Sequence, residues 1–310
     1  MSESPLVSIL INNYNYGHFL GDAIDSALNQ IYPHVEVIIV DDGSIDDSRQ
    51  VIAQYGDRIK SILKENGGQA SAFNTGFLAS RGQVICLLDS DDMFLPTKIQ
   101  RVVEILGNQQ ELGWCFHSLT AVNTEGSAII ADEEYFPQKI RYISSKQDVR
   151  SQMLWGKLGS PFIIPATSGL CFTRLLLSQI LPMPEEKEVS LSDSYIKFVA
   201  LGLSAGFILK DELALQRLHG NNLFTGQKDH QKSAKIHILT AYWMKVNFPQ
   251  LSRFANNIFA AGVKEFKDHK RSTSTVEPDV QECIRKYFAI ANLTDRIQIL
   301  SKLFYYRFKS

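Results

Sequence analysis

The chain has 310 residues, of which 45% are hydrophobic and 21% charged, the composition of an ordinary globular protein. Its formal net charge of −1 argues against a nucleic acid as the main partner. The four cysteines are scattered without a CxxC pair, so we expect neither a zinc site nor a disulfide framework, and a cytoplasmic location. We expect no signal peptide, because the first residues contain neither a basic n-region nor an apolar h-region. We expect no transmembrane segment, because no apolar run approaches the roughly 18–20 residues that a span requires.

The first third of the chain alternates between short apolar runs and amphipathic segments. The apolar runs predict strands at residues 6–11, 35–40, 59–64 and 84–88. Apolar residues at helical spacing predict a helix at residues 19–30. The carboxylates of Asp46 and Asp47 favour the start of a second helix there, and further helices are expected at 69–80 and 97–106. This alternation predicts an α/β fold with a mainly parallel central sheet and helices on both faces.

Polar segments follow each of the four predicted strands. They occupy residues 12–15, 41–42, 66–68 and 89–92. Ligands of parallel α/β sheets bind at the carboxyl ends of the strands, so these segments predict a site for a nucleotide and a metal. The chain has no GxGxxG after the first strand and no GxxxxGK[ST], so neither a dinucleotide fold nor a P-loop is indicated.

The most acidic of these segments contains Asp89, Asp91 and Asp92. Three carboxylates within four residues repel one another, and a hard divalent cation with oxygen ligands would bring them together. The alternative is a solvated acidic turn that caps the helix after Pro96.

The rest of the chain predicts further elements and a boundary. We expect a strand at 114–122, a hairpin turn at 123–126, a mobile loop at 132–146, a helix at 146–155, an extended segment at 161–172, a helix at 193–203 and two short strands at 207–209 and 214–218. From residue 229 onward the pattern is helical. We therefore expect a catalytic domain at residues 1–228 and a C-terminal helical region at 229–310.

Several motifs together resemble the inverting glycosyltransferases of family 2, which have the GT-A fold. They are Val7-Ser-Ile-Leu-Ile-Asn-Asn-Tyr-Asn-Tyr, the run from Ser26 to Ser44, Asn66-Gly-Gly-Gln, and Leu88-Asp-Ser-Asp-Asp ending in Leu-Pro. They occur in the family order and spacing over residues 6–98. The chain departs from the family pattern at Phe73, where an arginine is usual, at Ser192 before Asp193, and at Asn12-Asn13 in place of Pro-Thr.

The resemblance implies a nucleotide-sugar donor, with UDP as the expected nucleotide. Asp42 corresponds to the carboxylate that accepts the N3–H of uracil, although it could instead cap the next turn. Tyr14 corresponds to a residue that lies against the base, although it could instead pack in its loop. The further donor-site residues that the resemblance implies are Asn13, Asn66, Gly68, Asn74, Asp89, Ser90, Arg217 and His219.

The resemblance also implies which residues bind the metal and which residue acts as the catalytic general base. Asp91 and Asp89 would bind Mn²⁺ or Mg²⁺, which would stabilise the departing diphosphate. Asp193 would act as the general base on the acceptor hydroxyl, although it could instead cap its helix. His219 could reach a phosphate or the metal, or be solvated.

The expected function is therefore inverting, metal-dependent transfer of a sugar to a glycan or lipid-linked acceptor in cell-surface polysaccharide synthesis. The last helix mixes aromatic residues with Lys302, Arg307 and Lys309, so it could lie on the inner face of a membrane. It could equally pack on the catalytic domain or a second subunit. The alternatives are a sugar-nucleotidyltransferase, disfavoured by the lack of a basic glycine-rich loop after the first strand, and a non-catalytic nucleotide-binding module. The sugar, the acceptor hydroxyl and the oligomeric state do not follow from the sequence.

Overall fold

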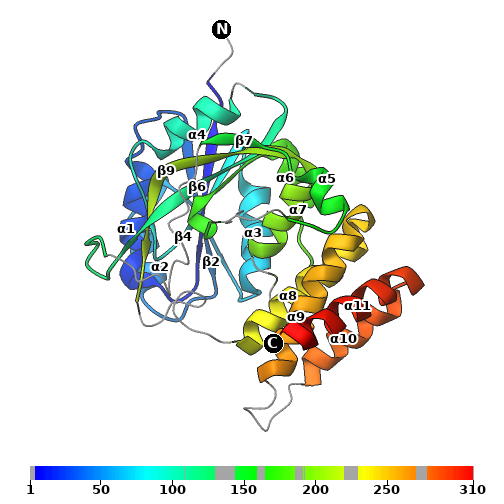
Figure 1. Ribbon diagram of the computed structural model, residues 1–310. Helices are drawn as coiled ribbons and strands as arrows, with labels where there is room; N and C mark the ends of the chain where they lie inside the picture. Colours follow the sequence, from blue (N-terminus) through cyan, green and yellow to red (C-terminus); the bar gives the residue numbers. More distant parts are fainter. Residues whose placement is uncertain are drawn as a thin grey trace. The chain divides into compact units, whose positions relative to one another are not determined.

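The structure is a computed structural model (Figure 1). It describes residues 4–107, 109–129, 144–158, 165–185, 191, 193–219, 230–269 and 278–309. The chain forms two compact units, and each contains several segments. The first comprises Met1–Asp148, Ile163–Glu185 and Leu203–Gly226, and the second Val149–Phe162, Glu186–Gly202 and Gln227–Ser310. The division into domains at residue 228 stays a prediction, because compactness alone does not show which segments fold independently.

The first unit is built on one mixed sheet. Its strands are β1 (Val7–Asn13), β2 (Val35–Asp42), β3 (Lys60–Lys64), β4 (Val84–Asp89), β5 (Met93–Phe94), β6 (Leu112–Val122), β7 (Ser145–Gln147), β8 (Leu170–Thr173) and β9 (Ala205–Arg217). Within the described residues the order is β3-β2-β1-β4-β8-β6-β9-β5, and β7 pairs with β9. The first four strands are parallel, as predicted, and β8 then pairs antiparallel with both β4 and β6.

Helices cover both faces of the parallel half of the sheet (Figure 1). The helices of this unit are α1 (Gly17–Leu28), α2 (Ser48–Ala53), α3 (Gly68–Ala79), α4 (Lys98–Leu106) and α6 (Arg174–Ile180). Alternate residues of β1, including Ile9 and Ile11, form one core with buried residues of α1, α2 and α4. On the other face, α3 lies so close that a Cβ on Gly76 would meet Leu10 at 3.5 Å. Burial on both faces explains why these strands are almost continuously apolar.

In the second half of the sheet the structure differs from four of the predicted elements. The strands expected at 207–209 and 214–218 are one strand, β9, whose register against β6 shifts near Ser118. Such irregularities let the charged residues in the middle of β9 face outward while the strand continues. The helix expected at 146–155 is strand β7 followed by α5 (Arg150–Leu154). Within the extended segment, only 170–173 is a strand, and 161–164 lies outside the described residues.

Helix α6 follows β8 and was not predicted. Thr173 begins it, because its hydroxyl accepts the N–H of Leu176 at 3.3 Å. The Thr-Arg-Leu-Leu-Leu sequence contains this cap, but the helix has only seven residues, too few for a clear apolar period. The loop expected at 132–146 lies mostly outside the described residues.

The second unit is helical. It contains α5, α7 (Asp193–Leu203), α8 (His230–Asn247), α9 (Ser252–His269), α10 (Pro278–Ile290) and α11 (Leu293–Lys309). Helix α9 packs against α8 and α11, and α10 packs against α8. The rings of Phe259 and Tyr287 stack in this core with their centroids 3.8 Å apart. The predicted C-terminal helical extension is thereby confirmed. Among the described residues, none of the helices is long and apolar enough to cross a membrane.

Candidate functional site

An acidic cluster lies at the carboxyl end of β4. Ligand oxygens of Asp89, Asp91 and Asp92 all lie within 4.8 Å of one another. The Asp92 N–H donates to the Asp89 carbonyl at 3.1 Å, which closes the turn between β4 and β5. Asp89 and Asp91 are partly exposed, whereas Asp92 is buried. The turn therefore presents two carboxylates to solvent above a third that is enclosed by protein.

The enclosed carboxylate of Asp92 has two neutral hydrogen-bond donors. Ser168 Oγ donates to it at 2.6 Å, and the backbone N–H of Arg217 donates at 3.0 Å. Burial and the neighbouring Asp91 carboxylate raise the pKa of Asp92 to about 8. A cation bound at the cluster would act in the opposite direction and favour the ionised form.

A buried lysine lies under the same cluster. Lys98 is fully buried at the start of α4, and its Nζ donates to the Ser168 carbonyl at 2.7 Å. The Nζ also lies 3.2 Å from the centroid of the Phe94 ring. The pKa of Lys98 lies below its ordinary value, because the effect of burial exceeds the opposite effect of the nearby cysteines and Asp92. Neither Lys98 nor Ser168 was predicted, because nothing in their local sequence indicates that they meet the acidic turn.

The end of β9 brings Arg217 and His219 to the cluster. His219 Nε2 lies 3.0 Å from Asp91 Oδ2. The guanidinium of Arg217 instead donates to Asp22 at 2.7 Å and lies 4.4 Å from the Phe19 ring centroid. The structure thus places the His219 ring at the acidic cluster, but it holds the Arg217 side chain against α1.

Tyr16 also belongs to this region and was not singled out by sequence. Its ring lies 5.6 Å from that of His219. Burial and the carboxylates of Asp91 and Asp89 raise the pKa of Tyr16 to about 12. The signal was present in the turn-rich segment between β1 and α1, where Tyr14 had been preferred. Tyr14 is 48% exposed.

The carboxyl ends of β1 and β2 carry a second polar group. The Asn13 amide donates to Asp41 at 2.9 Å and to Ser44 at 3.1 Å. Asp41 also accepts from Arg49 at 3.1 Å. The Asn13 side-chain oxygen and both polar atoms of the Asn12 amide are buried without a hydrogen-bond partner among the described residues. These amide atoms are therefore candidates to bind water or a ligand.

Asp42 organises the turn between β3 and α3. Its carboxylate accepts from Lys64 Nζ at 2.7 Å and from the N–H groups of Gly67 and Gly68 at 3.0 and 2.7 Å. The Asn66 amide donates to the Asp42 carbonyl at 2.9 Å. Three of the predicted donor residues, Asp42, Asn66 and Gly68, therefore lie together. The Asp42 carboxylate is therefore engaged with the turn between β3 and α3, whereas the turn directly after β2 is capped by Asp41, which accepts the Ser44 N–H at 3.2 Å.

A cavity of about 560 Å³ opens beside this turn. It is lined by Gly43, Ser44, Ile45, Arg49, Leu63, Lys64, Glu65 and Asn66. Gly43 has a φ of +82°, and a Cβ there would lie 2.6 Å from the Asn66 nitrogen, so only glycine fits this approach. The cavity thus lies at the carboxyl ends of β2 and β3, where ligands of parallel sheets bind.

The remaining predicted residues lie in different surroundings. Asn74 is buried in α3, where its amide bonds both backbone groups of Met183 and the Glu185 carboxylate. Ser90 is buried in the acidic turn. Asp193 begins α7 in the second unit, and its carboxylate lies 2.7 Å from Lys197 Nζ, one turn along the helix. The described contacts therefore give Asn74 an anchoring role and Asp193 a helix-terminal position.

Comparison with known proteins adds the family. Residues 8–168, just over half of the chain, match the family described as Glycosyl transferase family 2. The chain belongs to glycosyl transferase family 2. The match begins within β1, includes β2 to β7 and ends at Ser168, so the acidic cluster of this family 2 member and the serine that contacts it both lie inside the matched region.

Two curated relatives extend this finding. An uncharacterized glycosyltransferase of Nostoc sp. is 36% identical over 220 residues, which are 70% of this chain and 66% of the relative. TuaG of Bacillus subtilis, named for teichuronic acid biosynthesis, is 38% identical over 106 residues, 33% of this chain and 42% of that protein. The family 2 chain thus spans less than two thirds of the length of each relative.

Solved structures share the fold. TarS of S. aureus in complex with UDP-GlcNAc has a TM-score of 0.61 and 16% identity, with 96% of this chain and 79% of that chain covered. The mannosyltransferase PcManGT of Pyrobaculum calidifontis, in complex with GDP-Man and Mn²⁺, has a TM-score of 0.54 and 15% identity, with 98% and 88% covered. The predicted GT-A fold is thereby confirmed.

Proposed function

We propose that the chain transfers a sugar from a nucleotide-sugar donor, expected to be UDP-linked, to a glycan or lipid-linked acceptor in cell-surface polysaccharide synthesis. The observation that carries the proposal is the acidic cluster at the end of β4, held by contacts from Ser168, Arg217 and His219. Family membership supports the class of reaction. The teichuronic acid name of TuaG supports the acceptor class, and the ligand of TarS supports a UDP-sugar.

The residues of the cluster suit a divalent cation. Carboxylate oxygens are the ligands that Mg²⁺ and Mn²⁺ prefer, and the partly exposed carboxylates of Asp89 and Asp91 would provide them. The His219 ring, 3.0 Å from Asp91, could add a nitrogen ligand or orient that carboxylate. The Mn²⁺ in the complex of the related fold PcManGT supports this choice. A bound cation would stabilise the negative charge that develops on the departing diphosphate.

The nucleobase of the donor is proposed to occupy the cavity beside the turn between β3 and α3, which Asp42 contacts. Its lining places the Lys64 ammonium and the Arg49 guanidinium next to exposed apolar atoms of Leu63. A flat, polar-edged base can lie on apolar atoms while its edge contacts polar groups. Asp42 would accept the N3–H of uracil only by adding to, or replacing, its contacts with Lys64, Gly67 and Gly68.

Asp193 is proposed as the general base of an inverting displacement. A single displacement at the anomeric carbon inverts its configuration and needs one carboxylate to take the proton of the acceptor hydroxyl. Lys197 Nζ lies 2.7 Å from the Asp193 carboxylate and holds that side chain at the start of α7. Proton NMR of the product, which distinguishes the two anomers, tests the inversion.

The first experiment measures the binding of Mn²⁺ and Mg²⁺ to the chain by titration. Sugar transfer is then measured with a panel of UDP-, GDP-, dTDP- and CDP-sugars. We expect Asp91→Asn to weaken cation binding and to lower turnover about 100-fold or more, since a bound cation contributes several kcal/mol to the transition state. Asp57→Asn, an exposed carboxylate outside the cluster, is the matched control and should change neither.

The outcomes separate the parts of the proposal. Turnover that prefers a nucleotide other than UDP would overturn the uracil assignment and keep the transferase. Cation binding without turnover for any donor would support the non-catalytic alternative. Equal turnover by wild type and Asp91→Asn, or turnover in the presence of a chelator, would reject the metal dependence.

A further inference from the structure

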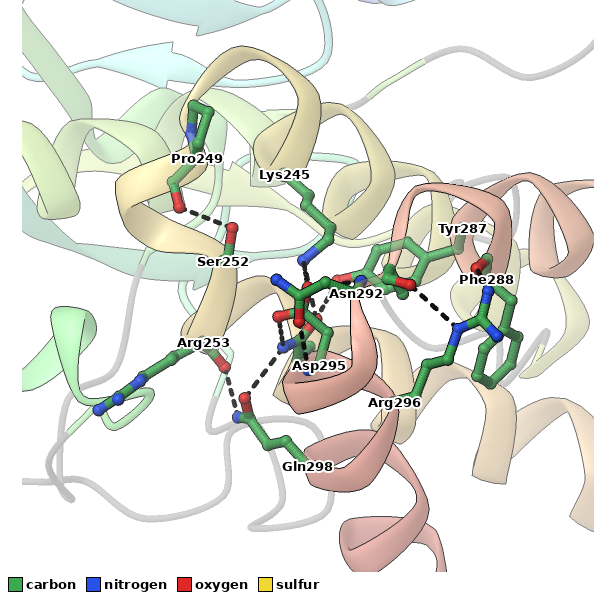
Figure 2. Close-up of polar contacts among 12 residues, drawn as sticks. Lys245, Pro249, Ser252, Arg253, Tyr287, Phe288, Asn292, Asp295, Arg296 and Gln298 are labelled. Atoms are coloured by element: carbon green, nitrogen blue, oxygen red, sulfur yellow. Dashed lines mark hydrogen bonds and ion pairs between the residues drawn. The ribbon is translucent and has the colours of Figure 1, made fainter.

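The last helix, α11, has one face fixed against the helical unit by a buried polar network. Lys245 Nζ of α8 lies 2.7 Å from the Asp295 carboxylate (Figure 2). The amide of Asn256 from α9 donates to the same carboxylate at 2.8 Å, and the Tyr287 hydroxyl of α10 donates to Asn256 at 2.8 Å. Ile299, one turn after Asp295, is fully buried. Because α8 and α9 contact Asp295 directly and α10 is linked to it through Asn256, the rotation of α11 about its own axis is set.

This rotation leaves an apolar stripe on the outside of α11. The stripe consists of Leu293, Ile297, Leu300, Phe304 and Phe308, which are between 58% and 75% exposed. Their spacing of three or four residues places all five on one side of the helix, along about 22 Å. Single exposed apolar residues are common on protein surfaces, but a continuous stripe of five large ones indicates an interaction surface.

The charges of α11 are almost all positive. Its sequence contains Arg296, Lys302, Arg307 and Lys309 against a single acid, Asp295, whose carboxylate is paired with Lys245. Arg296 is held beside the stripe, because its guanidinium donates to the carbonyls of Ala291 and Phe288 at 3.0 and 2.9 Å. The net charge of the whole chain is −1, so this basic character belongs to the helix and not to the protein in general.

The nature of the partner follows from combining the stripe with these charges. A second copy of the chain docked stripe to stripe would bring two basic helices together, which like charges disfavour. The complementary surface is apolar in its middle and anionic around it. An interfacial helix with Phe and Leu on one face, and with Arg and Lys on other parts of its circumference, matches the boundary between acyl chains and anionic headgroups. We propose that α11 docks the chain on an anionic lipid bilayer through Leu293, Ile297, Leu300, Phe304 and Phe308.

The test is sedimentation of the full chain with lipid vesicles, which does not depend on transferase activity. We expect partition into phosphatidylcholine vesicles that contain phosphatidylglycerol to exceed partition into pure phosphatidylcholine at least about tenfold, and to fall with added salt. The double variant Ile297→Ser, Phe304→Ser should lower partition at least about tenfold, since two large apolar side chains are no longer buried. Leu175→Ser is the matched control, because Leu175 is 75% exposed on α6 and should leave partition unchanged.

The proposal is overturned if the wild-type chain sediments with neither kind of vesicle, or if the double variant partitions onto vesicles as strongly as the wild type. Light scattering that shows a dimer, dissociated by the double variant and accompanied by no vesicle binding, would make the stripe an interface between copies and also overturn it. If circular dichroism shows that the double variant is unfolded, Arg307→Glu replaces it. That variant keeps the stripe, so undiminished partition would contradict the proposal.

Discussion

Ser168 Oγ donates a hydrogen bond to Asp92 at 2.6 Å and accepts the backbone N–H of Asp89 at 3.1 Å. One buried hydroxyl thus connects the enclosed member of the acidic cluster to the residue that ends β4. Lys98 Nζ fixes the same residue from below through the Ser168 carbonyl. The carboxylates at the surface of the cluster therefore depend on a serine that itself has no exposure to solvent.

Replacing this serine tests the arrangement. Ser168→Ala leaves the Asp89 N–H without its side-chain acceptor and leaves Asp92 with only one of its two donors, the Arg217 N–H, so we expect the free energy of unfolding to fall by about 1–3 kcal/mol. We also expect Mn²⁺ affinity to fall about 10- to 100-fold, the range for residues that orient metal ligands. Chemical denaturation and calorimetric titration measure the two effects. Ser178→Ala on the exposed side of α6 is the control, and equal effects of the two variants would contradict the role of Ser168.

Asn74 distinguishes an anchoring role from a nucleotide-binding role. Its amide accepts the Met183 N–H at 2.7 Å and donates to the Met183 carbonyl at 2.8 Å, both in the protein interior. We expect Asn74→Ala to lower the free energy of unfolding by about 1–3 kcal/mol, because two buried backbone groups lose their partners.

Nucleotide affinity, measured on the same variant at a temperature where it is folded, decides the second role. A loss of UDP affinity beyond about tenfold would support the assignment made from the family motif, since one or more direct contacts would have been removed. Unchanged affinity together with lowered stability would restrict Asn74 to holding the segment around Met183.

Asp193→Asn tests the general base. The amide keeps the shape of the side chain but cannot accept the acceptor proton, so we expect kcat to fall about 10²- to 10⁴-fold with the donor KM unchanged. Steady-state kinetics at saturating acceptor measure this. Lys197→Met is the matched variant, because it removes the ion pair at 2.7 Å and keeps the carboxylate. If Lys197→Met lowers kcat as much as Asp193→Asn, the ion pair and not the base function explains the loss.

Asp295 predicts a dependence of stability on pH in the helical unit. Burial raises the pKa of Asp295, but hydrogen bonds from Lys245 and Asn256 outweigh it, so the pKa lies below its ordinary value of 3.8. The unfolded chain therefore binds the proton at higher pH than the folded chain. The stabilisation is present above about 3.8 and is lost as the pH falls through the lower, folded-state value.

Asp295→Asn makes this dependence measurable. The variant leaves the Lys245 ammonium without its anion, and we expect a loss of about 3 kcal/mol near neutral pH, the lower end for breaking a buried ion pair. The difference from wild type should shrink in acid, where wild-type Asp295 becomes protonated. Urea denaturation followed by circular dichroism measures both. Asp268→Asn, which breaks an exposed pair with Lys264, should cost less than about 1 kcal/mol, and a pH-independent effect of Asp295→Asn would refute the linkage.

The parts of the fold that were predicted correctly depend on local pattern. The apolar runs of β1 to β4 and the helical spacing of apolar residues in α1 are each contained within about a dozen residues. The single strand β9 was divided in two, because the charged residues around Asp211 interrupt its apolar pattern. Only the neighbouring strand β6 and the Arg101 side chain, 3.0 Å from Asp211, explain how those charges are accommodated.

For the site, local sequence pattern is enough to assign the carboxylates at the ends of β2 and β4, because strand ends and turns are set by neighbouring residues. The groups that surround these carboxylates depend on the tertiary fold. Ser168 is 79 residues from Asp89, and Arg217 is 125 residues from Asp92, so no local signal connects them. These residues come together because apolar surfaces that are distant in sequence are buried against one sheet. That packing determines which groups form hydrogen bonds with the cluster.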